Sequence, residues 1–133
     1  MELDGESANH SGMRSVHYYI NQIFGASAEL ISYYGPVQMC VFGLEYVYLP
    51  LKYTIKVECE RGFIQIEIID EEGKTFSPWM IFPESRYYHF EDKKSDVHQL
   101  IELSYKAIVE KKIIFMGKED RCRALSSIEF LDK

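Results

Sequence analysis

The chain has 133 residues, of which 47% are apolar or aromatic and 27% are charged. This length and composition suit one globular domain, because two ordinary domains need a longer chain and disordered chains contain fewer apolar residues. The formal net charge of −6 argues against a nucleic-acid-binding protein and against adsorption to anionic membranes, since both depend on Lys and Arg.

The N-terminal segment, residues 1–12, is polar and rich in turn-forming residues. We expect it to be a flexible tail that precedes a single α+β domain over residues 13–133. It has no features of a secretion signal, and no window reaches the roughly 18 apolar residues of a transmembrane helix. Three widely spaced cysteines, Cys40, Cys59 and Cys122, suit neither a disulfide framework nor a metal knuckle. These features together predict a cytoplasmic protein.

The first predicted element is a helix that begins at a cap on Ser15 and ends at about Tyr34. Apolar residues recur there at three- and four-residue spacing, which is typical of one buried helix face. The spacing is interrupted near Gly25, so a kink or two shorter helices remain open alternatives. We expect Gly35 and Pro36 to end the helix, because glycine is common at the C-cap and proline beyond it.

Residues 37–49 are apolar at almost every position, which is typical of a strand buried on both faces. Gly43 in the middle indicates a bulge or a break between two strands. Glu45 is the only charged residue of the stretch. We place it at a bend or an edge, because a buried charge needs a partner.

Residues 53–69 alternate strictly between apolar and polar on both sides of Arg61-Gly62, which predicts a β-hairpin. A two-residue loop there places Glu60 opposite Phe63. One face of the hairpin then carries six apolar residues: Ile55, Val57, Cys59, Ile64, Ile66 and Ile68. A slip of one residue would place apolar residues opposite charged ones, so the register is well specified. We expect this hairpin to lie at the centre of the sheet and its apolar face to pack against a later helix.

A turn over residues 70–74 leads to a further strand, residues 75–82. Pro78 predicts that this strand lies at an edge of the sheet or is broken by a bulge, because proline cannot donate to a strand ladder. The strand is very apolar and includes Trp79, so something should cover it. A homodimer through this edge strand is one alternative.

A second helix is expected from a cap at Ser95 to the lysines Lys111 and Lys112, which suit its negative C-terminal end. The complete layout predicts an α+β fold. In it, a mostly antiparallel sheet of four to five strands has the N-terminal helix and the later helix packed on one face.

No motif for catalysis or for cofactor binding occurs, so we expect no cofactor and no metal, and a binding protein in preference to an enzyme. Cys122 lies between two arginines, which makes it the one thiol with a pattern that favours reactivity. His89 and Glu91 share one face of a predicted strand, but two ligands do not make a metal site.

Acidic residues are concentrated in the hairpin and the turn after it. The candidate partner-binding residues are these acids and two nearby aromatic residues: Glu58, Glu60, Glu67, Asp70, Glu71, Glu72, Tyr53 and Trp79. Such a surface would steer a cationic partner towards the protein, with the aromatic rings supplying contact area. The plain alternative is a solvated sheet face that discourages edge pairing.

We therefore expect a small acidic binding protein that neutralises a basic protein partner, such as a toxin domain. Small acidic α+β domains without catalytic motifs are common among bacterial immunity proteins and antitoxins, although no shared motif links this chain to them. Two alternatives remain. One is a small-ligand-binding protein or enzyme with a pocket between sheet and helices, and the other is a structural subunit of a homo- or hetero-oligomer.

Overall fold

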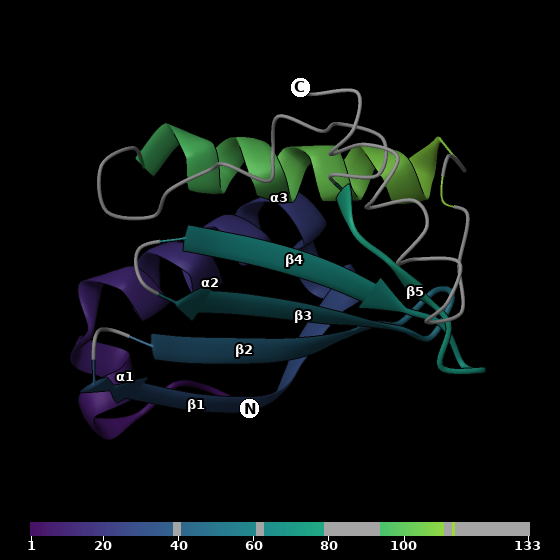
Figure 1. Cartoon of the computed structure of the whole chain (residues 1–133). Coiled ribbons are helices and arrows are strands. Elements are labelled where there is room, and N and C mark those ends of the chain that lie inside the picture. The colour runs from purple at the N-terminus through teal and green to yellow at the C-terminus, as the bar shows by residue number, and fades with distance from the viewer. Residues whose placement is uncertain (39–40, 61–62, 79–93, 111–112, 114–133) are drawn as a thin grey trace.

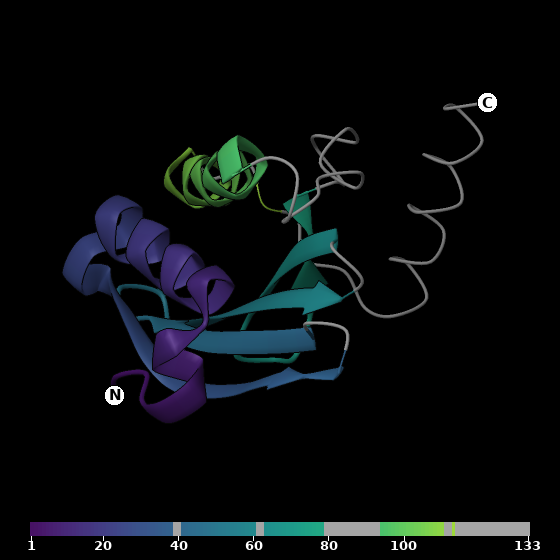
Figure 2. The same cartoon turned by 90° about the vertical axis from the view of Figure 1, so that its left-hand side faces the viewer.

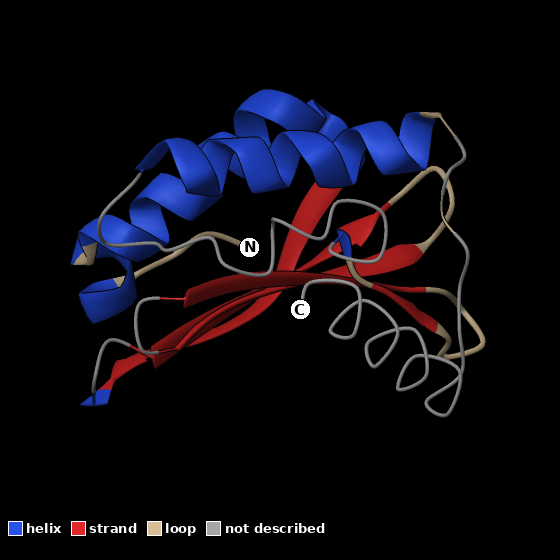
Figure 3. Cartoon of the chain, turned by 45° about the horizontal axis from the view of Figure 1, so that its top comes forward, coloured by secondary structure: helices blue, strands red, loops and turns tan. Residues whose placement is uncertain are grey.

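The structure is a computed structural model that describes residues 1–38, 41–60, 63–78, 94–110 and 113. Its elements are α1 (Gly5–Asn9), α2 (Ser11–Phe24), a 3-10 turn (Gly25–Ser27), β1 (Ala28–Val37), β2 (Val41–Tyr48), β3 (Tyr53–Glu60), β4 (Phe63–Ile69), β5 (Thr75–Phe76) and α3 (Lys94–Val109). The five strands form one antiparallel sheet in the order β1-β2-β3-β4-β5 (Figure 1). Helices α2 and α3 lie side by side on one face of it (Figures 2 and 3). The predicted α+β fold is confirmed.

The hairpin of β3 and β4 has the register that the alternation of its residues predicts. Glu60 lies opposite Phe63, and Val57 lies opposite Ile66. The six predicted inward residues are all buried, and α3 packs on β4. The two strands occupy the third and fourth positions of the sheet, so the prediction of a central hairpin is confirmed.

The core lies between the sheet and the two helices. Buried residues recur at three- and four-residue spacing along both helices, as an amphipathic helix requires: Met13, Val16, Ile20 and Phe24 in α2, and Val97, Leu100, Ile101, Ser104 and Ile108 in α3. The fully buried hydroxyl of Ser104 donates a hydrogen bond of 2.8 Å to the carbonyl oxygen of Leu100. This polar group is therefore satisfied within its own helix.

Helix α2 ends at Phe24, so the prediction of a helix to about Tyr34 is wrong. Gly25 adopts a φ of 60° and its N–H bonds to the carbonyl oxygen of Asn21, which terminates the helix. Residues 28–37 form β1 instead. The sequence has adjacent apolar residues at Leu30 and Ile31, and the strand accommodates them with a register shift between Leu30 and Ser32. Their spacing then imitates the periodicity of a helix.

Gly35 and Pro36 lie within β1 and do not end a helix as predicted. Among the described strands, β1 lies at the edge of the sheet beside β2, and proline is tolerated at such an edge because its missing N–H need not break a ladder bond.

Residues 1–12, which the sequence predicts to be a flexible tail, contain α1 and the start of α2. Ser7 is buried, and its hydroxyl donates to the carbonyl oxygen of Gly35. The hydroxyl of Tyr33 donates to Oδ1 of Asp4 at 2.7 Å. Both contacts tie the N-terminal segment to β1, and they depend on a partner strand that is remote in sequence.

Strand β2 runs unbroken through Gly43, so the predicted bulge or break does not occur there. Glu45 is in the middle of this strand and not at a bend or an edge. It is half-buried, and the strand register places it opposite Lys56. A cationic neighbour explains how the strand accommodates this carboxylate.

The strand predicted over residues 75–82 is described only at its start, where β5 pairs with β4 at the edge of the sheet. Other predictions fall on residues outside the described ranges and are not tested by the structure. These residues are Cys40, Arg61, Gly62, Trp79, His89, Glu91, Lys111, Lys112 and Cys122.

Candidate functional site: the acidic face of the sheet

The face of the sheet opposite α2 and α3 carries a band of charged residues. They alternate along β2, β3 and β4 with the buried core residues, so their side chains project to the other side of the sheet. We call this band the acidic face, and it comprises Glu45, Lys56, Glu58, Glu60 and Glu67. Four carboxylates and one ammonium group give it a formal charge of −3.

The charges of the acidic face are unevenly distributed along β3. Lys56 lies between Glu45 on one neighbouring strand and Glu67 on the other, and opposite charges in such cross-strand positions attract. Glu58 and Glu60, nearer the end of β3, have no cationic residue opposite them in the described strands. Within the described strands, the carboxylates at this end therefore lack the cross-strand cation that Glu45 and Glu67 have in Lys56.

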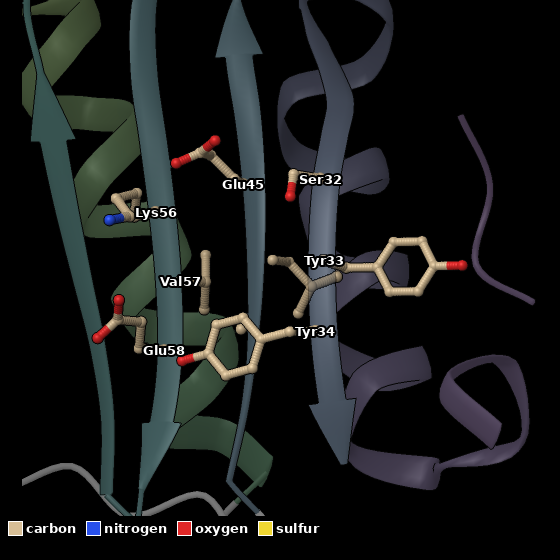
Figure 4. A pocket seen from close by; sticks show the side chains of 9 residues that line it. Ser32, Tyr33, Tyr34, Glu45, Lys56, Val57 and Glu58 are labelled. Atoms are coloured by element: carbon tan, nitrogen blue, oxygen red, sulfur yellow. The ribbon is translucent and has the colours of Figure 1, made fainter. Parts of the chain in front are cut away.

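A hollow of about 190 Å³ opens on the acidic face beside Tyr34 (Figure 4). Its lining comes from three neighbouring strands and includes Ser32, Tyr34, Gly43, Glu45, Lys56 and Glu58. The ring of Tyr34 extends from β1 across β2, with its hydroxyl end towards Glu58. A Cβ built at position 43 would lie 2.3 Å from Cε1 of this ring, so the ring can rest here because residue 43 is glycine.

The pKa of the Tyr34 hydroxyl reflects the negative charge around the hollow. Partial burial and then the carboxylates of Glu58 and Glu60 raise the pKa of Tyr34 above its ordinary value of 10.0. Ionisation of the phenol is unfavourable, because it places a negative charge beside the existing carboxylates. By the same argument, a positive charge brought to this position would be favoured.

A second hollow, of about 330 Å³, adjoins the first and shares Glu58 with it. It is lined by Glu58, Glu60, Phe63 and Gln65. Tyr34 is 50% exposed and Phe63 is 40% exposed, so an accessible aromatic ring lies on each side of the two carboxylates. Exposed aromatic rings beside charged residues are features of protein-binding surfaces.

The structure divides the predicted partner-binding residues into separate groups. Glu58, Glu60 and Glu67 share the acidic face. Asp70, Glu71 and Glu72 lie in the turn between β4 and β5, at the other end of β4 from Phe63. Trp79 is outside the described residues.

The acids of this turn differ from one another in their surroundings. Oδ1 of Asp70 accepts hydrogen bonds from the backbone N–H groups of Glu72 at 3.0 Å and of Lys74 at 2.8 Å. Glu72 pairs with Lys74 at 3.5 Å in an exposed position, and Glu71 is exposed. The carboxylate of Asp70 is thus engaged in holding the turn together.

Tyr53 lies on the face of the sheet that packs against the helices, because it alternates in phase with the buried Ile55 and Val57. It is half-buried, and its ring centroid is 6.4 Å from that of Tyr48. The structure therefore does not bring Tyr53 together with the acidic face.

Sequence reasoning missed a polar cluster around His17 on α2. Nδ1 of His17 lies 2.7 Å from the hydroxyl oxygen of Tyr46, and Nε2 lies 3.3 Å from Nδ2 of Asn21. Burial lowers the pKa of His17 from 6.5, and burial raises the pKa of Tyr46 strongly. The available signal was the tyrosine in an apolar strand, since a buried phenol usually has a hydrogen-bond partner.

The cluster borders a hollow of about 320 Å³ between α2 and the start of β1, lined among others by His17, Asn21 and Glu29. Within the described part of the chain, no group of three or more His, Cys, Asp or Glu residues is arranged to hold a metal ion.

The chain matches no protein-family model, and comparisons with curated proteins and with solved structures found no significant match. None of the described helices combines the length and the apolar character needed to cross a bilayer.

Proposed function

We propose that this chain is a non-enzymatic binding protein that neutralises a basic protein partner, in the manner of a bacterial immunity protein or antitoxin. The acidic face is the observation that carries this proposal. It places carboxylates of three adjacent strands on one side of the sheet, opposite the helices. A surface of this kind attracts cationic partners over a distance of about one Debye length, roughly 8 Å at physiological salt.

The carboxylates of the acidic face and the aromatic rings beside them have different roles in this proposal. Glu58 and Glu60 supply the attractive charge, because the residues that pair with them in the described strands are not cationic. Tyr34 and Phe63 supply accessible rings that a partner can cover. The acids therefore govern the rate of association, while the rings govern the lifetime of the complex.

The proposal places the protein in the cytoplasm. The sequence has three widely spaced cysteines, a pattern that does not suit a disulfide framework and fits a reducing compartment. The turn acids Glu71 and Glu72 add to the overall negative field. Asp70 is excluded from direct partner contact in this proposal, because its carboxylate holds the turn.

A charge-reversal experiment tests the proposed function. The partner is first isolated by pull-down from native lysate and identified by mass spectrometry. The triple variant Glu58→Lys, Glu60→Lys and Glu67→Lys is then compared with the wild-type protein in stopped-flow association at low ionic strength. We expect the association rate constant to fall about ten-fold or more, with a smaller difference at high salt.

The matched control reverses three acids outside the acidic face, Glu71, Glu72 and Glu102, which are all exposed. It changes the net charge by the same amount, so it should slow association clearly less than the face variant. Equal effects would show that only total charge matters. An unchanged rate in the face variant, together with salt-independent binding, would refute the proposal.

One observation favours a second candidate function, a small-ligand site between helix and sheet. The hollow beside His17 offers an imidazole and the amide of Asn21 in a recess at the edge of the core. A thermal-shift screen of small metabolites against wild type and the variant His17→Ala tests it. Stabilisation that requires His17 would favour this function over protein binding.

A further inference from the structure

We infer that the hollow beside Tyr34 receives one arginine side chain of the partner. This inference rests on the proposed function, because it specifies which group of a basic partner the acidic face recognises.

The ring of Tyr34 is positioned as a platform for a planar cation. It lies over Gly43, which brings it close to the sheet, and half of its surface stays exposed. Figure 4 shows the ring spread across β2 with one face outward. A guanidinium group stacks on such a ring by cation–π attraction.

Carboxylates on neighbouring strands supply acceptors for the same group. Glu45 and Glu58 both line the hollow, and the hydroxyl of Ser32 lies at its rim on β1. A guanidinium donates several hydrogen bonds in its plane while it stacks on a ring, whereas the ammonium of lysine is a compact point charge. The arrangement of ring and carboxylates therefore suits arginine better than lysine.

Lys56 limits the hollow to a single cation. Its side chain also lines the hollow, but Figure 4 shows its ammonium group turned away from the Tyr34 ring. In the strand register it lies between Glu45 and Glu67. A second cation would meet repulsion from this ammonium group, and the adjoining hollow at Glu58 and Phe63 is the place where a neighbouring residue of the partner would lie.

The test uses fluorescein-labelled hexa-arginine and hexa-lysine peptides with the full chain, measured by fluorescence anisotropy at low ionic strength. We expect hexa-arginine to bind more tightly than hexa-lysine. Tyr34→Leu should weaken hexa-arginine binding about 3- to 10-fold and change hexa-lysine binding much less, whereas Tyr34→Phe should retain the preference. The matched control is Tyr18→Leu, because Tyr18 is 58% exposed but lies on α2.

A second variant protects the test against misfolding of Tyr34→Leu. Gly43→Ala retains the Tyr34, Glu45 and Glu58 side chains but forces the Tyr34 ring from its position, so it should reduce the arginine preference as well. Circular dichroism and thermal melting confirm that each variant is folded.

The outcomes separate this inference from the function on which it rests. If neither peptide binds, the proposed function itself is overturned. If both peptides bind equally, or if Tyr34→Leu and Gly43→Ala leave the arginine preference intact, the arginine site is overturned while the acidic face remains a docking surface. Loss of the preference in the Tyr18→Leu control would likewise overturn the site.

Discussion

The hydroxyl oxygen of Tyr46 lies 2.7 Å from Nδ1 of His17, and this hydrogen bond joins β2 to α2 at the margin of the core. Tyr46 is fully buried and is surrounded by apolar residues. Its phenol requires a partner there, because an unsatisfied buried hydroxyl is costly. His17 supplies that partner from a half-buried position and is itself bonded to Asn21. The protonation state of His17 is therefore coupled to the packing of α2 on β2.

Replacement of His17 by Gln should weaken the pH dependence of stability on the acidic side of neutrality. Burial lowers the pKa of His17 below 6.5, so the unfolded chain takes up this proton more readily than the folded chain. The stability associated with neutral His17 is therefore fully present above the pKa of His17 in the unfolded chain. It is lost as the pH falls from about 6.5 towards the lowered pKa of His17 in the folded chain. Urea denaturation at about pH 7.5 and 5.5 measures this. If wild type and variant lost the same free energy of unfolding between the two pH values, the prediction would be contradicted.

The variant Tyr46→Phe should be destabilised at neutral pH by about 0.5–1.5 kcal/mol, the usual net contribution of one hydrogen bond. The ring and its packing are retained, so the change removes only the hydroxyl that contacts His17. Equilibrium urea denaturation gives the difference. Tyr18→Phe, which removes a hydroxyl bonded to Gln22 at an exposed position, is the control and should stay within about 0.5 kcal/mol of wild type.

The variant Val57→Ala should lower the free energy of unfolding by about 1–3 kcal/mol through lost burial and a cavity. Val57 is fully buried, and it lies opposite Leu44 on β2 and Ile66 on β4. Glu60→Gln, on the opposite face of the same strand, is the control. A cost of only a few tenths of a kcal/mol for Val57→Ala would mean that the hairpin contributes little to the core.

The hairpin could be predicted from the sequence because alternation over two adjacent segments determines both its register and its buried face. The boundary between α2 and β1 could not be predicted from the sequence. Gly25 marks the end of the helix, but the residues after it keep an apolar spacing that suits a helix as well as a strand with an irregular register. Pairing with β2 selects the strand, and that pairing depends on residues remote in sequence.

The candidate site was predicted in part. Alternation alone placed Glu58 and Glu67 on the solvent side of the sheet. The hollow could not be predicted, because the contact of Tyr34 with Gly43 depends on how β1 pairs with β2. The role of Asp70 was also missed, since its hydrogen bonds to the turn distinguish it from the neighbouring Glu71 only in three dimensions.

Cys59 should resist alkylation in the native state. Its side chain is only 1% exposed, and a reagent can reach it only through opening of the core. The measurement uses a variant with Cys40→Ser and Cys122→Ser, so that Cys59 is the one remaining thiol. We expect no labelling by iodoacetamide in buffer and stoichiometric labelling in urea. Rapid labelling in buffer would show that this part of the core opens readily.

The turn between β4 and β5 gives a test that separates structural from docking carboxylates. Asp70→Ala should reduce stability by about 0.5–1.5 kcal/mol, because it removes the acceptor of two backbone hydrogen bonds. Asp70→Asn keeps an oxygen at that position and should retain most of the stability. Glu71→Ala, at the next residue, should stay within about 0.5 kcal/mol of wild type. Urea denaturation of the three variants provides the comparison.

Association kinetics of Asp70→Asn and Glu71→Gln with the isolated partner complete this test, since each variant removes one negative charge. If the turn acts only through the overall field, both variants should slow association by a similar small factor at low salt. A large effect confined to Asp70→Asn would instead identify Asp70 as a contact residue, and the assignment of its carboxylate to the turn would then be wrong. Equal stability of Asp70→Ala and Glu71→Ala would contradict the same assignment independently of any partner.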